Sequence, residues 1–244
     1  RPVIVDEPLF ELVSNNPSLP DTYKQKMVLI PGVQGDSPIV GEYRDEETGN
    51  HVVRMAKYSR LIAAELGLDK SECETIELAA PMHDIGKIGI PDQILLKPGK
   101  LAPEEFTVMQ QHTSIGYEIL KDSPSRYLQM GAVIALGHHE KYDGNGYPGG
   151  LSGENIPLPA RIVAVADVYD ALSSRRCYKP AWAHKDVMQL LHTESGRHFD
   201  PRCIDAFMRR LDEVRKIQDM LRDDRNSNAE PAASKVRAPV ETLV

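Results

Sequence analysis

The sequence contains little cysteine and no long apolar segment. Its three cysteines, Cys73, Cys177 and Cys203, lie far apart and without a CxxC spacing, so neither a disulfide framework nor a cysteine-bound zinc site is indicated. We therefore expect free thiols in a reducing cytoplasm. No apolar run approaches the roughly 20 residues that cross a bilayer, and no signal peptide is visible. The sequence thus predicts a cytoplasmic protein without a membrane span.

Positive charge is also scarce. The chain has 29 lysines and arginines against 36 acidic residues, a net charge of −7. Proteins that bind duplex nucleic acid normally carry a broad basic face, so this class is disfavoured, whereas a small anionic ligand held by a few cations stays open. The 244 residues suffice for one large domain or two small ones. Because the chain begins at Arg1 rather than Met, we expect the natural protein to have further residues upstream.

Alternation with period two is rare, and most of the chain has helical periodicity, so we predict an all-α fold. Residues 1–42 are rich in Pro, Gly, Asn and Ser and are predicted to be an irregular segment, the remnant of an upstream regulatory region. Residues 43–225 are predicted to form one helical domain. Residues 226–244 are polar and are predicted to be a disordered tail.

Capping residues predict where helices begin and end. Ser71 and Glu74 have the spacing of a capping box and are expected to start a helix. Asp200 and Pro201 are expected to cap a last helix that runs to about Arg225. The segment "PARIVAVADVYDAL" is apolar nearly all round, which predicts a buried helix.

Five of the eight histidines lie within predicted helices or at their ends, and acidic residues accompany two of them. Glu47 precedes His51 by four residues, which puts both on one side of a helix. Asp84 directly follows His83, and adjacent helical residues point about 100° apart. These two can serve one site only if the helix ends there or if the site holds more than one ion. The same condition applies to the adjacent pair His138 and His139. The five histidines are His51, His83, His112, His138 and His139.

A carboxylate inside an apolar helix adds to this group. Asp167 interrupts "IVAVADVYDAL", where a charge is costly unless it is paired or bound to metal. A single buried histidine is more often a hydrogen-bonded core residue than a ligand, and a buried aspartate can cap a neighbouring helix. Five histidines, two aspartates and a glutamate together favour a metal centre. Imidazoles and carboxylates without thiolates suit Fe, Mn, Ni or Zn, and they are too many for one tetrahedral ion. Two or three ions at ~3.5–4 Å would suit hydrolysis of phosphate esters.

The motifs "EETGNH", "HDIGK", "HHEKYDGNGYP" and "ADVYDALSSRRCYK", in this order, resemble the HD-GYP family of cyclic di-GMP phosphodiesterases, a branch of the HD metal-dependent phosphohydrolases. The resemblance covers about residues 43–208. An HD dipeptide alone is a weak signal, whereas the ordered series is specific. The resemblance implies an HD-domain helical bundle with a glycine-rich GYP loop after the histidine pair.

The resemblance also implies roles for individual residues. Asp84 is expected to bridge two ions, and Lys87 to touch the scissile phosphate. Arg176 and Lys179 match the positions that hold the ligand's phosphates, and Tyr147 is expected near the substrate, with a loop-anchoring ring as its alternative. The implied metal ligands are Glu47, His51, His83, Asp84, His112, His138, His139 and Asp167.

One departure from the family pattern concerns the phosphate-binding segment. The chain reads "RCYK" where the family usually has Arg-Pro-Tyr-Lys, so Cys177 replaces proline. Loss of proline frees a φ angle and adds an N–H, and we expect a looser segment. Among the other histidines, His184 and His192 are expected on solvated helix faces, and His198 is expected to pack rather than to bind.

The implied activity is hydrolysis of cyclic di-GMP to linear pGpG, GMP or both, in bacterial second-messenger signalling. No Ser or Cys sits with a base in a recognisable motif, so water is the expected nucleophile. The implied cofactors are two or three divalent ions, iron or manganese, with nickel and zinc as alternatives; Glu47 is the residue associated with a third ion. The implied partners are GGDEF-type cyclases or adaptor domains at the GYP loop, and an upstream receiver or sensor domain. The alternatives are a phosphohydrolase acting on another cyclic dinucleotide or on a nucleotide monoester, and a non-catalytic cyclic di-GMP sensor or docking module, which a missing ligand would favour.

Overall fold

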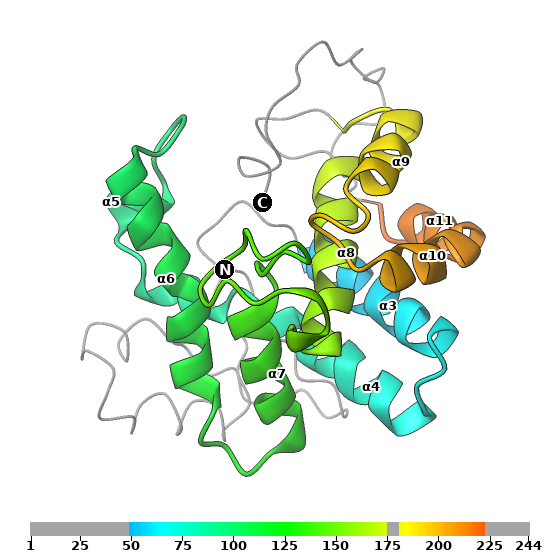
Figure 1. The fold of residues 1–244 in the computed structure, drawn as a ribbon, viewed down its shortest axis with the longest axis horizontal. Helices are drawn as coiled ribbons and strands as arrows, with labels where there is room; N and C mark the ends of the chain where they lie inside the picture. The colour runs from blue at the N-terminus through cyan, green and yellow to red at the C-terminus, as the bar shows by residue number, and fades with distance from the viewer. Residues whose placement is uncertain (1–48, 175–180, 223–244) are drawn as a thin grey trace.

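The computed structural model describes residues 49–174 and 181–222, and every regular element within these ranges is a helix (Figure 1). The predicted all-α fold is confirmed. None of the described helices is long and apolar enough to span a bilayer. The predictions made for residues 1–42 and 226–244 fall outside the described residues. So do those for Glu47, Arg176, Cys177 and Lys179.

Nine α-helices and three 3-10 helices make up the described part of the chain. In chain order they are α3 (Gly49–Glu65), α4 (Lys70–Ala79), η1 (Ala80–Met82), η2 (Ile85–Gly89), α5 (Asp92–Leu95), α6 (Pro103–Leu120), α7 (Arg126–Gly137), η3 (Gly153–Asn155), α8 (Leu158–Ser173), α9 (His184–Thr193), α10 (Pro201–Arg209) and α11 (Leu211–Met220).

Helix α8 lies at the centre of the packing. It contacts α3, α7, α9 and α10 (Figure 1). Nearly all of its side chains from Ala160 to Leu172 are buried, as the apolar segment predicted. Helices α6 and α7 pack against each other, and α4 packs against both α3 and α7. A polar side chain on the inner side of α8 therefore lies among several helices and must find its partners inside the protein.

The start of α4 differs from the prediction. The capping box is formed by Asp69 and Glu72, whose side chains each accept a hydrogen bond from the other's backbone N–H, at 2.8 and 3.0 Å. The predicted box of Ser71 and Glu74 is wrong, because the helix begins at Lys70 and Ser71 already lies in its first turn. The Ser71 hydroxyl instead accepts a hydrogen bond from the guanidinium of Arg126.

The end of the domain also differs. Asp200 caps α10 as predicted, accepting from the backbone N–H of Arg202 at 2.8 Å. The prediction of a single last helix is wrong, because the helix is interrupted at Arg210 (φ −102°, ψ 13°), which separates α10 from α11. Arg210 pairs with Glu213 at 2.6 Å and with Glu65 of α3 at 3.6 Å. These contacts, together with buried Val214, turn α11 across α3.

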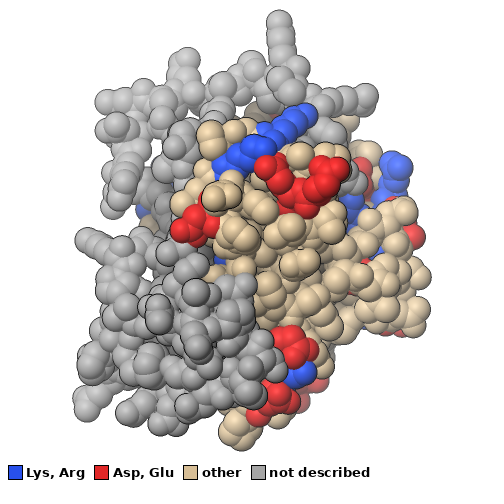
Figure 2. All heavy atoms as spheres, turned by 90° about the vertical axis from the view of Figure 1, so that its left-hand side faces the viewer, with Lys and Arg blue, Asp and Glu red and all other residues tan. Residues whose placement is uncertain are grey.

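One face of the molecule carries its charges in small mixed groups. Figure 2 shows acidic and basic side chains near the top, the bottom and the right-hand edge of its described part, with a broad area lacking charge between them. Lys97 and Glu105 form an ion pair at 2.6 Å. No broad basic surface appears among the described atoms of this face.

Candidate metal centre

Helix ends and two helix interiors bring seven of the candidate ligands together. Helix α4 ends at Ala79, and His83 and Asp84 follow between η1 and η2. The condition that a helix must end at this adjacent pair is therefore met. His138 and His139 likewise follow the last residue of α7. The first turn of α3, the middle of α6 and the middle of α8 provide the other three, His51, His112 and Asp167.

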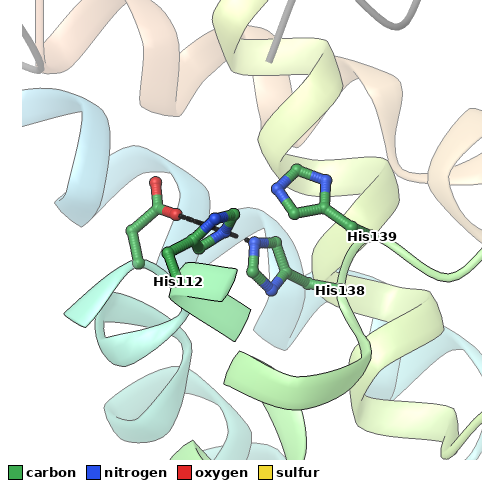
Figure 3. A group of neighbouring side chains, drawn as sticks. His112, His138 and His139 are labelled. Carbon is green, nitrogen blue, oxygen red and sulfur yellow. Dashed lines mark ion pairs between the residues drawn. The ribbon is translucent and has the colours of Figure 1, made fainter. Parts of the chain in front are cut away.

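The first group of potential ligands consists of Asp84, His112, His138 and His139, whose ligand atoms lie within 4.8 Å of one another. Asp84 Oδ1 lies 3.3 Å from His112 Nε2 and 3.7 Å from His138 Nε2. Figure 3 shows the rings of His112 and His138 directed toward a carboxylate oxygen, with the ring of His139 beside them. Three helical segments thus direct their polar atoms to one point.

The second group consists of His51, His83 and Asp167, again within 4.8 Å of one another. His51 Nε2 lies 3.5 Å from Asp167 Oδ1. The other oxygen of Asp84, Oδ2, lies 3.2 Å from His83 Nε2. The two oxygens of Asp84 therefore face one group each, which is the position that a bridging carboxylate needs.

Backbone carbonyls orient three of the rings. In His83, His112 and His138 the Nδ1 atom lies 3.1, 2.7 and 3.0 Å from the carbonyl oxygen three residues earlier. Because a carbonyl oxygen only accepts, Nδ1 carries the proton and donates, and Nε2 directs a lone pair toward the cluster. This is the arrangement of metal-ligating histidines, in which the second ring nitrogen is held by a hydrogen bond.

The inward atoms lack hydrogen-bond partners among the described residues. Asp84 Oδ1, Asp167 Oδ1, His112 Nε2 and His138 Nε2 are all buried without one. A buried polar group left in this state costs about 1–3 kcal/mol. The 3.3 Å contact of Asp84 Oδ1 with His112 Nε2 also brings two acceptors together, which a cation between them would stabilise. The donor set of imidazole nitrogens and carboxylate oxygens fits a divalent transition metal.

The protonation states agree with this fit. Burial lowers the pKa of His112 to about 4 and that of His139 well below its ordinary value, so both rings are neutral near pH 7. Burial alone would raise the pKa of Asp84, but the neighbouring Lys87 ammonium and, after it, His83 outweigh burial and hold that pKa well below the usual range. The Lys87 ammonium lies 2.7 Å from Asp84 Oδ2. Neutral imidazoles and ionised carboxylates are the forms that bind metal.

The glycine of "HDIGK" permits a close approach of backbones. A Cβ atom at Gly86 would lie 1.8 Å from the carbonyl oxygen of His112 and 2.5 Å from the backbone nitrogen of Gly116. Only glycine fits there. This contact lays η2 on α6 and so brings Asp84 against His112.

The loop after the histidine pair is held by a buried carboxylate. Glu140 is 3% exposed, and its carboxylate accepts hydrogen bonds from the backbone N–H groups of Gly149 at 2.6 Å and Leu151 at 2.9 Å. At Gly146 a Cβ would lie 2.2 Å from the backbone nitrogen of Lys141, so the loop folds tightly on itself. The sequence interpretation missed Glu140, although a carboxylate next to a glycine-rich segment, with its many free N–H groups, was a usable signal.

Tyr147 lies beside the cluster. Its ring stacks on His139, with centroids 4.7 Å apart and planes at 25°, and meets the ring of Phe106 edge-on. This place is compatible with both roles considered for Tyr147, as a loop anchor and as a group near the substrate.

A second missed residue is Asp170. It is fully buried, and its Oδ2 lies 2.8 Å from His51 Nδ1. The available signal was its spacing of three residues from Asp167, which puts both on one side of α8.

The remaining histidines lie as expected. His184 and His192 are exposed on α9. His198 is buried and stacks on Phe199, with ring centroids 4.3 Å apart, and it belongs to neither ligand group.

Comparison with known proteins places the chain. Residues 35–203 match a family model described as HD domain. The chain belongs to the HD-domain family. It is 54% identical over 176 residues to the cyclic di-GMP phosphodiesterase response regulator RpfG of Xanthomonas campestris. The matched region covers 72% of this chain and 47% of that protein. These findings confirm the family resemblance that the motifs indicated.

Two further relatives extend the comparison. A cyclic di-GMP phosphodiesterase of Thermotoga maritima is 46% identical, over 78% of this chain and 52% of that protein. A 3'3'-cGAMP-specific phosphodiesterase of Vibrio cholerae is 45% identical, over 75% of this chain and 35% of that protein. The chain thus spans about half the length, or less, of these relatives.

Solved structures share the fold. A cyclic GMP-AMP phosphodiesterase of V. cholerae has a TM-score of 0.52 at 18% identity, covering 71% of this chain and 46% of its own. An HD-GYP-type protein from Bdellovibrio bacteriovorus has a TM-score of 0.52 at 21% identity, covering 68% of this chain and 54% of its own. The HD-domain architecture is therefore confirmed.

Proposed function

We propose that this chain is a metal-dependent phosphodiesterase that hydrolyses cyclic di-GMP to pGpG, GMP or both, in bacterial second-messenger signalling. The observation that carries the proposal is the pair of ligand groups that lie on either side of Asp84, one facing each of its oxygens. Relatives at 46–54% identity are named as cyclic di-GMP phosphodiesterases, which supports the substrate.

The proposed cofactors are two divalent ions, iron or manganese, with nickel and zinc as alternatives. Bound ions would supply an activated water and would neutralise charge on the phosphate oxygens. Glu47 precedes α3 by two residues, and we propose it as the ligand that gives room for a third ion. The other proposed ligands are His51, His83, Asp84, His112, His138, His139 and Asp167.

The chain's own cations would hold the substrate. The Lys87 side chain is 11% exposed and its ammonium contacts Asp84, so it lies next to the shared carboxylate. From there it would bind the scissile phosphate and could hold the proton that the leaving ribose oxygen needs. Arg176 and Lys179 are proposed to bind the substrate's phosphates by charge-assisted hydrogen bonds. Tyr147, beside His139, is proposed to line the same side of the site.

A second candidate is another cyclic dinucleotide. Several relatives, at 36–45% identity, are named as 3'3'-cGAMP-specific phosphodiesterases. A non-catalytic sensor is less well supported, because all eight candidate ligand positions carry a residue able to bind metal.

We also propose partners of the complete protein. The X. campestris relative is named a response regulator, and this chain covers 47% of that protein. Both facts support an upstream receiver or sensor domain in the complete protein. GGDEF-type cyclases or adaptor domains are proposed to dock at the GYP loop.

Metal and product analysis of the same preparation tests the proposal. The protein is purified anaerobically, its metals are counted, and it is incubated separately with cyclic di-GMP and 3'3'-cGAMP before products are separated by mass. We expect cleavage of cyclic di-GMP by the wild type and by Asp205→Asn, which alters an exposed aspartate, and none by Asp84→Asn. Faster cleavage of 3'3'-cGAMP would favour the second candidate. Tight binding without cleavage by the metal-loaded protein would favour a sensor.

A further inference from the structure

A buried arginine joins three helices near the second ligand group. Arg54 lies one turn beyond His51 in α3 and is 1% exposed. Its guanidinium binds both oxygens of Asp170, at 2.7 and 2.8 Å. It also donates to the hydroxyl of Ser174 at 3.0 Å, just after α8, and to the carbonyl of Leu221 at 2.8 Å, just after α11. A single side chain therefore connects α3 with the ends of two other helices.

Asp170 passes this connection to a candidate ligand. Its Oδ2 lies 2.8 Å from His51 Nδ1, so one carboxylate contacts both Arg54 and His51. The rings of His83, His112 and His138 are held by backbone carbonyls, whereas His51 is held by a side chain whose own position depends on Arg54. A carboxylate behind a histidine fixes the ring and makes it a stronger ligand.

The end of α11 completes the connection. The last carbonyls of a helix have no partners within it. Directly after α11, the carbonyl of Leu221 accepts a hydrogen bond from the Arg54 guanidinium, and that of Arg222 accepts one from the side-chain amide of Asn50 at 3.2 Å. Both donors lie on the first turns of α3, on either side of His51 in the sequence. The end of α11 and the start of α3 therefore stabilise each other.

We propose that Arg54 and Asp170 are positioning residues that set the orientation of His51. The half of the metal centre formed by His51, His83 and Asp167 then depends on the end of α11. The half formed by Asp84, His112, His138 and His139 does not, because carbonyls of α6 and α7 hold the rings of His112 and His138. This inference rests on the proposed two-ion centre.

The test compares two equivalent arginine substitutions. Arg54→Lys keeps the charge but loses the two-pronged contact with Asp170. Arg161→Lys is the same substitution in a second buried arginine–aspartate pair, in which Arg161 of α8 contacts one oxygen of Asp200 and neither residue belongs to a ligand group. Metal-free protein is titrated with Mn²⁺ and bound ions are counted. We expect two ions in the wild type and in Arg161→Lys. In Arg54→Lys we expect one ion with unchanged affinity and one weakened about 10–100-fold.

A second variant separates the roles of the two residues. Asp170→Asn keeps the shape of the side chain but weakens its hold on His51, so we expect the same selective loss of one ion. Equal weakening of both ions, or of neither, in both Arg54→Lys and Asp170→Asn would overturn the inference. A wild type that binds no second ion and leaves cyclic di-GMP uncleaved would instead count against the proposed function.

A measurement on the wild type keeps the inference testable if the variants fail to fold. Coupling between two sites is reciprocal, so an ion that requires an ordered His51 must in turn stabilise the end of α11. We expect Mn²⁺ to slow hydrogen–deuterium exchange in residues 211–222 of the wild type and of Arg161→Lys. Arg54→Lys should lose this effect. Unchanged exchange of these residues in the wild type with Mn²⁺ bound would overturn the inference.

Discussion

The carboxylates of the ligand cluster differ from the buried carboxylates that surround it. Asp84 and Asp167 each have a buried oxygen without a hydrogen-bond partner among the described residues. Glu140 and Asp170 are equally buried, but backbone N–H groups satisfy the first and side-chain donors satisfy the second. Burial alone therefore does not mark a metal ligand. A candidate metal ligand is distinguished by a buried acceptor atom that has no hydrogen-bond donor and faces other acceptor atoms.

This difference separates two kinds of contribution. A cluster carboxylate supplies a charge to a bound cation, so its loss should remove metal. A surrounding carboxylate holds backbone or side-chain donors in place, so its loss should change geometry while the ligands remain. Substitution of a cluster carboxylate should therefore lower metal content, whereas substitution of a surrounding carboxylate should leave metal content unchanged and alter geometry.

The largest effect is expected at Asp84. Asp84→Ala removes the oxygens that face both ligand groups and should abolish both hydrolysis and stoichiometric metal. The apolar core around α8 should preserve the helical fold. Metal analysis and circular dichroism of the same sample measure the two expectations. A variant that keeps its full metal content would contradict the bridging role and with it the difference between cluster and surrounding carboxylates.

The next effect is expected at Glu140, one of the surrounding carboxylates. Glu140→Gln replaces one acceptor by a donor that faces the backbone N–H groups of Gly149 and Leu151, at a cost of about 1–3 kcal/mol in unfolding free energy. Tyr147 should lose its fixed place on His139. We expect a raised KM for cyclic di-GMP with unchanged metal content. The control is Glu154→Gln, in the same region but 70% exposed. Loss of metal in Glu140→Gln would show that Glu140 contributes to metal binding and belongs with the cluster carboxylates.

How far the sequence alone leads is visible in particular residues. Helical periodicity and the order of the histidine motifs were sufficient to predict an all-α fold and to select side chains that the structure brings together. The start of α4 was misplaced because Asp69 with Glu72 and Ser71 with Glu74 have the same spacing, and local sequence does not distinguish overlapping boxes. The break at Arg210 was missed because it depends on packing against α3.

Positioning residues were harder to foresee than candidate ligands. Asp170 is visible in the sequence, but its partners His51 and Arg54 lie more than a hundred residues earlier. Glu140 is adjacent to the histidine pair, yet its role depends on how the glycine-rich loop folds back. Ligand residues are recognisable by type and motif, whereas a positioning role is defined by contacts that form only in the folded chain.

A smaller effect is expected from Arg176, which tests whether substrate contacts are separate from the metal cluster. A charge-assisted contact with phosphate is worth roughly 1.5–3 kcal/mol. Arg176→Ala should therefore weaken apparent affinity for cyclic di-GMP by about tenfold or more, with unchanged metal content. Unaltered kinetics would make Arg176 an ordinary surface cation, in line with the looser segment expected from Cys177.

The smallest effect is expected at His198, a buried histidine outside the cluster. Burial lowers its pKa to about 4, whereas an unfolded histidine has a pKa of about 6.5. Between these values the unfolded chain binds more protons, so stability contributed by neutral His198 is complete above pH 6.5 and is lost as the pH falls. At pH 5 the loss should be about 1–2 kcal/mol. Urea unfolding of metal-free protein at pH 7 and pH 5 measures it, and His198→Gln should show the smaller decrease between the two. An equal decrease in both proteins would mean that the pKa of His198 is the same in the folded and unfolded states, and that burial outside the cluster does not keep a histidine neutral at pH 5.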